Sequence, residues 1–186
     1  MGQRALLLGL GLAAAIVAWA AITYNRLVRL RFQADNAWSD IDVQLKKRHD
    51  LVPNLVETVK GYAAHERATL DLVVSARGRA MAVSAPAERA QAESALTDAL
   101  RRLLVVVEAY PNLKANASFL DLQAQLSQVE NDLAAARRYY NAVVRDYNSQ
   151  TETVPSNLVA RVFAFSGRDF FQADEADRPA VAVKLG

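Results

Sequence analysis

The sequence predicts an all-α protein in which an N-terminal transmembrane helix continues into a long antiparallel four-helix bundle. Three observations support this prediction. An uncharged apolar run of 19 residues, 5–23, lies near the N-terminus. Beyond it, apolar residues recur at alternating steps of three and four, which is the period of packed helices. Only 7 Gly and 5 Pro occur among 186 residues, so the turn chemistry of a β-sandwich is not expected.

The composition excludes several kinds of site. A formal net charge of +2 is too small for a nucleic-acid footprint, so no nucleic-acid partner is expected. The chain has no Cys. Disulfides, thiolate zinc sites, Cys nucleophiles and a lipidated cysteine anchor are therefore excluded.

The first element is the apolar run, which we interpret as a membrane anchor that contacts the lipid bilayer through residues 5–23. A helix of this length spans roughly 28 Å, close to the thickness of the bilayer hydrocarbon. Trp19 and Tyr24 lie near its end, where aromatic rings favour the membrane interface. The alternative is a signal peptide cleaved after Ala20, which would release a secreted soluble bundle. Residues 12–52 contain no Gly or Pro, which favours the anchor and predicts one rod from membrane to bundle.

The positive charges around the anchor predict its orientation. Arg4 precedes the run, whereas Arg26, Arg29 and Arg31 follow it. The positive-inside rule then places the N-terminus outside and the bundle in the cytoplasm. The excess of positive charge after the run is small, so a periplasmic or extracellular location of the bundle is an alternative. Small residues four apart in the run could also pack against the same helix of a second copy, so a homo-oligomer is a further alternative.

Four soluble segments follow, and each carries an apolar row with the spacing of packed or coiled-coil helices. In chain order the rows are Leu30, Ala34, Trp38, Ile41, Leu45; Val52, Leu55, Val59, Tyr62, Thr69, Val73, Ala76, Ala80; Ala92, Leu96, Ala99, Leu103, Val106, Tyr110; and Phe119, Leu122, Leu126, Val129, Leu133, Ala136, Tyr140, Val143, Tyr147. Segments of similar length joined by short links favour an antiparallel bundle.

Helix breakers and capping residues predict the boundaries between these segments. Asp50 is expected to cap the second helix, with Pro53 in its first turn. In the alternative, Pro53 only kinks a longer continuous helix. Pro86 is expected to begin the third helix, Pro111 to follow its end, and Ser118 to cap the fourth.

These boundaries divide the chain into an anchor at residues 1–25, a helical bundle at 26–153, and a short helix with a C-terminal tail at 154–186 that packs on the bundle. Residues 158–163 have the pattern of a short amphipathic helix. An acidic patch at 174–177 and a strand-like apolar segment at 180–183 follow it.

Several motifs resemble those of the LemA family of bacterial membrane proteins. The resemblance covers most of the chain, and its longest block lies at residues 24–77. The segments that carry it are Tyr24-Asn25-Arg26-Leu27-Val28, Ala37-Trp38-Ser39-Asp40-Ile41-Asp42, Asp50-Leu51-Val52-Pro53-Asn54-Leu55, His65-Glu66, Ala76-Arg77, Pro155-Ser156-Asn157-Leu158-Val159-Ala160 and Phe170-Phe171.

The resemblance implies an up-and-down bundle of long helices behind one membrane helix, located at the bacterial cell membrane. It carries no catalytic residue over to this chain. Together with the predicted anchor, it leads us to expect a single-pass, non-catalytic scaffold or regulator of an unidentified protein partner.

Five polar or amphipathic residues lie on or beside the predicted core rows, and we take them as candidate interaction or buried polar residues. They are Trp38, Asp42, Gln44, Arg48 and Glu66. Buried charges need partners. These residues are therefore expected either to form internal pairs that fix the helix register or to line a groove that a partner fills.

The sequence also allows an alternative of another class, a metal-binding or enzymatic bundle that uses His49, His65 and Glu66. His65-Glu66 begins like the zinc motif H-E-x-x-H, but Thr69 occupies the position of the second histidine. No phosphate-binding loop or nucleophile elbow accompanies it. We therefore expect no catalytic, cofactor or metal residues.

Overall fold

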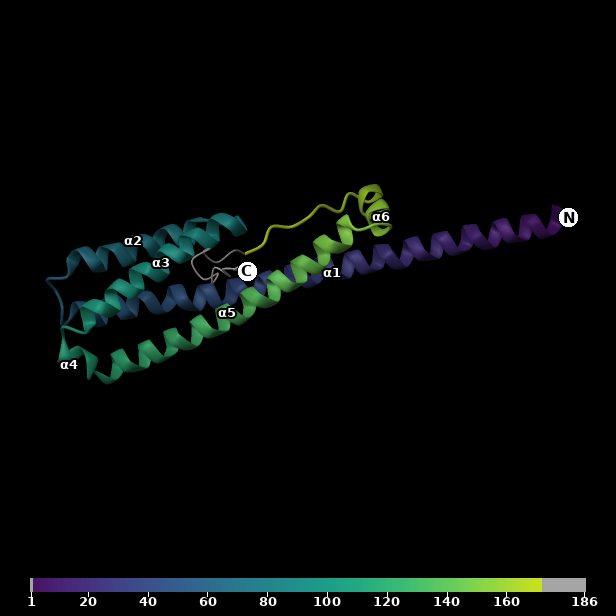
Figure 1. Ribbon diagram of the computed structural model, residues 1–186. Helices are drawn as coiled ribbons and strands as arrows, with labels where there is room; N and C mark the ends of the chain where they lie inside the picture. Colours follow the sequence, from purple (N-terminus) through teal and green to yellow (C-terminus); the bar gives the residue numbers. More distant parts are fainter. Residues whose placement is uncertain (1, 172–186) are drawn as a thin grey trace, which may run out of the picture. The chain divides into compact units, whose positions relative to one another are not determined.

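The computed structural model describes residues 2–171, and these form helices joined by short turns, with no strand in that range. Figure 1 shows α1 (Gly2–Lys60), α2 (Arg67–Ala82), α3 (Pro86–Val107), α4 (Pro111–Lys114), α5 (Ala117–Glu152) and α6 (Ser156–Val162). The predicted all-helical class is confirmed, and so is the short helix near residue 158. The acidic patch at 174–177 and the apolar segment at 180–183 lie outside the described residues.

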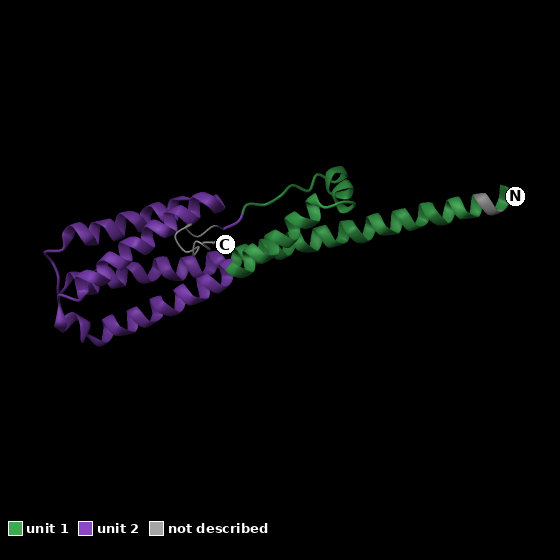
Figure 2. Ribbon diagram, viewed as in Figure 1, with its two compact units in different colours: residues 1–40, 138–169 green, residues 41–137, 170–186 purple. Residues whose placement is uncertain are grey.

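The chain divides into two compact units, which Figure 2 distinguishes by colour. Unit 1 comprises Met1–Asp40 and Arg138–Asp169, and unit 2 comprises Ile41–Arg137 and the chain from Phe170 onward. The helices α1 and α5 each contribute residues to both units.

Unit 1 contains the apolar start of α1. This helix is long and apolar enough to cross a membrane, and the side chains of residues 6–18 are exposed. The burial changes at the end of the apolar run, where Trp19 and Ala20 pack against a small core. That core consists of Leu27, Tyr147, Val159 and Ala160, supplied by α1, α5 and α6.

Unit 2 has a larger apolar core, to which the end of α1, all of α2 and α3, the short α4 and the start of α5 contribute. Its buried members are Val52, Leu55, Val56, Val59, Ala63, Leu70, Val73, Ala76, Ala80, Leu96, Ala99, Leu100, Leu103, Val107, Leu113, Phe119 and Leu126. Nearly all residues of the predicted apolar rows are buried or half-buried, as alternating three- and four-residue steps require.

The predicted helix start at Asp50 is wrong, because α1 continues without interruption to Lys60 and contains Pro53. The longer continuous helix of the alternative is confirmed, since α1 runs through Pro53. Proline lacks an N–H, so the carbonyl of His49, four residues earlier, loses its helical partner. The Nε of Arg77 donates to that carbonyl at 2.7 Å and replaces the missing bond.

The break between the first two soluble helices lies instead at residues 61–66. Gly61 follows the last helical residue, and glycine is among the poorest helix formers. Tyr62 was expected in the core row, but it lies in this turn and is exposed, and its hydroxyl accepts a hydrogen bond from Asn116 at 3.0 Å. Because the apolar residues keep their regular spacing on both sides of Gly61, the sequence pattern does not predict this turn.

The link between α3 and α5 also differs from the prediction. The helix α3 ends at Val107, and Pro111 begins the short α4 within the link. Asn116, not Ser118, caps α5, since its Oδ1 accepts a hydrogen bond from the backbone N–H of Phe119 at 3.0 Å. Asn and Ser are comparable N-cap residues, so their identity alone does not select between them.

Candidate functional site

The most distinctive polar site is a cluster of charged side chains inside unit 2, centred on Arg48 of α1. The Arg48 side chain is fully buried. Its Nη1 lies 3.0 Å from Oε2 of Glu93, and its Nε lies 2.8 Å from Oε1 of Glu130. Its Nη2 donates to Oγ1 of Thr97 at 2.7 Å. One guanidinium therefore connects α1 to α3 and α5.

Glu93 is the acidic centre of this cluster, which we call the buried charge cluster, made of Arg48, His49, Glu93, Thr97 and Glu130. Glu93 is as fully buried as Arg48. Its second oxygen, Oε1, lies 2.7 Å from Nε2 of His49. Both carboxylate oxygens are thus occupied by side chains of α1, and α1 and α3 are connected by two adjacent polar contacts.

Arg137 of α5 adds a second arginine beside the cluster. Burial lowers the pKa of the Arg137 guanidinium, the positive charge of Arg48 lowers it further, and Glu130 and Glu93 oppose the shift. The guanidinium carbon of Arg137 also lies 4.8 Å from the centre of the Phe171 ring. Arg137 therefore interacts electrostatically with both glutamates and is repelled by Arg48.

The contacts of the cluster favour a structural role. Arg48 of α1 donates hydrogen bonds to Glu93 and Thr97 of α3 and forms an ion pair with Glu130 of α5, so these contacts link particular turns of three helices. A slip of any helix by one residue would separate these groups and leave charges buried without partners. The contacts agree with the expectation that internal pairs favour one helix register.

The other predicted residues lie outside the cluster. Asp42 pairs with Arg89 of α3, and Glu66 accepts a hydrogen bond from the Tyr110 hydroxyl at 3.2 Å. In unit 1, the Trp38 ring lies 5.3 Å from that of Tyr140, measured between centroids. Gln44 is half-buried, and its Oε1 has no hydrogen-bond partner within the described part of the chain. Of the five candidates, only Arg48 belongs to the cluster.

Sequence reasoning missed the role of Glu93 and Glu130. A signal for Glu93 existed, because it lies in a row of buried residues at steps of three and four. The row runs Glu93, Leu96, Leu100, Leu103 and Val107. An acidic residue at a core position predicts a buried cationic partner on a neighbouring helix.

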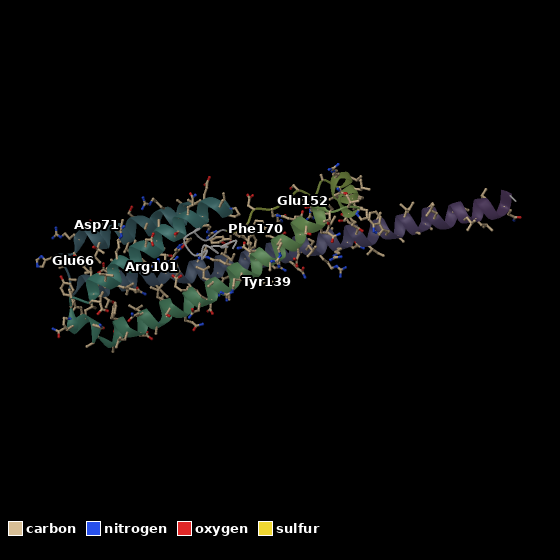
Figure 3. All side chains as sticks on the ribbon, in the orientation of Figure 1. Glu66, Asp71, Arg101, Tyr139, Glu152 and Phe170 are labelled. Atoms are coloured by element: carbon tan, nitrogen blue, oxygen red, sulfur yellow. The ribbon has the colours of Figure 1, made fainter. Side chains whose placement is uncertain are left out.

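The structure does not bring together the three residues of the metal-binding alternative. His49 is buried against Glu93, whereas His65 is exposed in the turn that precedes α2. Figure 3 places Glu66 at the start of α2, near Asp71. No group of three His, Asp or Glu side chains suited to a metal ion occurs among the described residues.

The contact between Arg77 and the His49 carbonyl can be tested by a double-mutant cycle with Pro53. Arg77→Ala leaves a carbonyl on a buried residue without a partner, so it should lower the free energy of unfolding by about 1–3 kcal/mol. In a Pro53→Ala background the new N–H can bond to that carbonyl, and the same change should cost clearly less. Thermal unfolding of the four proteins, followed by circular dichroism, measures the difference. Equal costs in both backgrounds would show that Arg77 does not compensate for the proline.

The fold and the site define an all-helical protein with a membrane-length apolar helix at its N-terminus and a paired charge cluster in its interior. The chain belongs to the LemA family, whose model matches residues 37–185.

Three relatives illustrate the range of similar proteins. Protein LemA of Metamycoplasma hominis is 27% identical over 83% of this chain and 71% of its own. Magnetosome protein MamQ 2 of Paramagnetospirillum magneticum is 24% identical, over 92% of this chain and 73% of its own. Magnetosome protein MamQ of Magnetospirillum gryphiswaldense is 21% identical over the same shares.

Proposed function

We propose that this chain is a single-pass protein of the bacterial cell membrane that presents an antiparallel four-helix bundle to partner proteins as a non-catalytic scaffold or regulator. One observation carries the proposal. The helix α1 contains both the membrane-length apolar run and, without interruption, the Arg48 that connects to α3 and α5.

The continuous helix determines what kind of scaffold this is. A flexible linker would let a tethered domain sample many distances from the bilayer, whereas an unbroken helix restricts both distance and tilt. The buried charge cluster supports the same role, because it fixes the register between α1 and its neighbours in unit 2. The proposal keeps the division expected from the sequence, with an anchor at 1–25, a helical bundle at 26–153 and a C-terminal segment at 154–186.

The proposed location follows from the arginines after the apolar run and from membership in the LemA family. We place the bundle in the cytoplasm, with the N-terminus outside, on the positive-inside rule. Labelling of a single cysteine at exposed Val105 with an impermeant reagent in intact cells tests this orientation, since a cytoplasmic cysteine reacts only after lysis.

The scaffold role can be tested by photo-crosslinking in intact bacteria. Photoreactive amino acids at Val74 and Val105, both exposed in unit 2, should capture a discrete set of proteins. A matched probe at Ile16, within the apolar run, should instead react with lipid. The scaffold role is contradicted if the probes in unit 2 capture only those proteins that a control membrane helix lacking unit 2 also captures.

Replacing His49 and His65 and measuring metal content tests the competing metal-binding role.

A further inference from the structure

The helix α6 in unit 1 has a face that the described residues leave uncovered. One side of α6 is buried: Val159 and Ala160 pack with Leu27 of α1 and Tyr147 of α5. The other side carries Leu158 and Val162, and both are exposed, as are Val154 just before the helix and Phe163 at its C-cap. We call these four residues the α6 apolar face. Leu158 and Val162 are one helical turn apart and therefore point the same way.

The helix α6 packs beside the end of the apolar run of α1. The core that contains Val159 and Ala160 also packs against Trp19 and Ala20, which belong to the last turns of the apolar run. The Tyr24 ring lies 4.7 Å from Phe163 and 5.7 Å from Phe165, measured between centroids. The helix α6 thus lies beside the point where α1 would leave the membrane.

The charges at this end of unit 1 suit a lipid surface. Arg26 and Arg29 are exposed just beyond the apolar run, and Arg161 is exposed on α6 itself. Glu152, at the end of α5 near α6 in Figure 3, supplies an opposing negative charge. The remaining positive excess, together with exposed apolar side chains on a short helix, is the pattern of an interfacial helix at an anionic membrane.

We propose that α6 lies in the membrane–water interface, with its apolar face inserted among the headgroups and upper acyl chains of anionic phospholipids. The inference rests on the proposed function, since it requires α1 to span the bilayer. It adds a second lipid contact beside the anchor, which restrains the rotation of α1 about its axis. The packing of α6 beside the last turns of the apolar run favours lipid over a second copy of the chain.

The test uses the absence of cysteine from this chain. A single spin label is placed at Val162→Cys in the full chain, reconstituted in vesicles of phosphatidylcholine and phosphatidylglycerol. Its collision rates with oxygen, which enters lipid, and with a nickel chelate, which stays in water, report its depth. Val105→Cys is the matched control, because Val162 and Val105 are exposed to 77% and 73%. We expect a nickel collision rate several-fold lower at residue 162 than at residue 105.

Each other outcome overturns the proposal in a recognisable way. Equal nickel accessibility at residues 162 and 105 places α6 in water. Dipolar broadening between labels at residue 162, removed by dilution with unlabelled protein, shows that a second copy covers the face. A third label at Ile16→Cys separates this inference from the proposed function: if it too is accessible to nickel, the membrane anchor itself is wrong. Equal depth in vesicles of phosphatidylcholine alone would contradict the requirement for anionic lipid.

Discussion

Replacing Glu93 with alanine should lower the free energy of unfolding by about 3–5 kcal/mol, because Arg48 would then be buried without its principal counter-charge. His49 would lose its carboxylate partner at the same time. Glu130 is partly exposed and offsets only part of this loss. Thermal unfolding of the full chain in mild detergent, followed by circular dichroism, measures the change.

Two further variants make this prediction specific to the buried pair. Glu108→Ala removes an exposed carboxylate that pairs with Lys114, and it should cost less than about 1 kcal/mol. The double change Arg48→Met with Glu93→Leu removes both charges and should recover much of the loss. A loss for Glu93→Ala no larger than that for Glu108→Ala would show that the cluster does not stabilise the fold.

Two arginines in the apolar run should remove the chain from the membrane. Leu12→Arg and Ile16→Arg each place a charge in the middle of the run, at a cost of about 3 kcal/mol per arginine. Their combined cost, about 6 kcal/mol, exceeds what a single short span can tolerate. We expect the wild-type chain in the carbonate-resistant membrane fraction and the double variant largely outside it.

The matched control adds the same two charges beyond the run. Gln33→Arg and Asn36→Arg lie at exposed positions of α1, so this variant should stay in the membrane fraction. N-terminal sequencing of the wild-type protein accompanies the experiment, because cleavage after Ala20 would itself separate unit 2 from the membrane. Membrane retention of the Leu12→Arg, Ile16→Arg variant equal to wild type would contradict the anchor.

The sequence predicts the helical class and most of the core because both depend on a local signal. A residue such as Leu133 is buried since it continues a row with steps of three and four over several heptads. The same regularity led to the error at Gly61, where the spacing resumes in phase after a turn. A single glycine is a weak signal beside a long apolar period.

Other features depended on contacts between distant segments. Pro53 resembles a first-turn proline until Arg77 is seen to bond with the carbonyl of His49, which lies 28 residues before Arg77 in the chain. The row that Arg48 continues predicts either an internal pair or a residue lining a groove, but its pairing with Glu93 and Glu130 depends on how α1, α3 and α5 pack. Local periodicity predicts which residues are buried, whereas tertiary packing determines which side chains they contact.

The most direct test of the central claim is whether the membrane helix continues without a break into the soluble part. Spin labels at Ala18→Cys and Asn36→Cys lie on exposed positions of α1, one in the apolar run and one beyond it. They are about five helical turns apart and share one face, so an unbroken helix separates them by about 27 Å. Double electron–electron resonance on the full chain in bilayers should give one narrow distribution near that distance. A broad distribution, or a clearly shorter mean, would reveal a hinge near Asn25 and contradict the account of a stiff membrane-held platform.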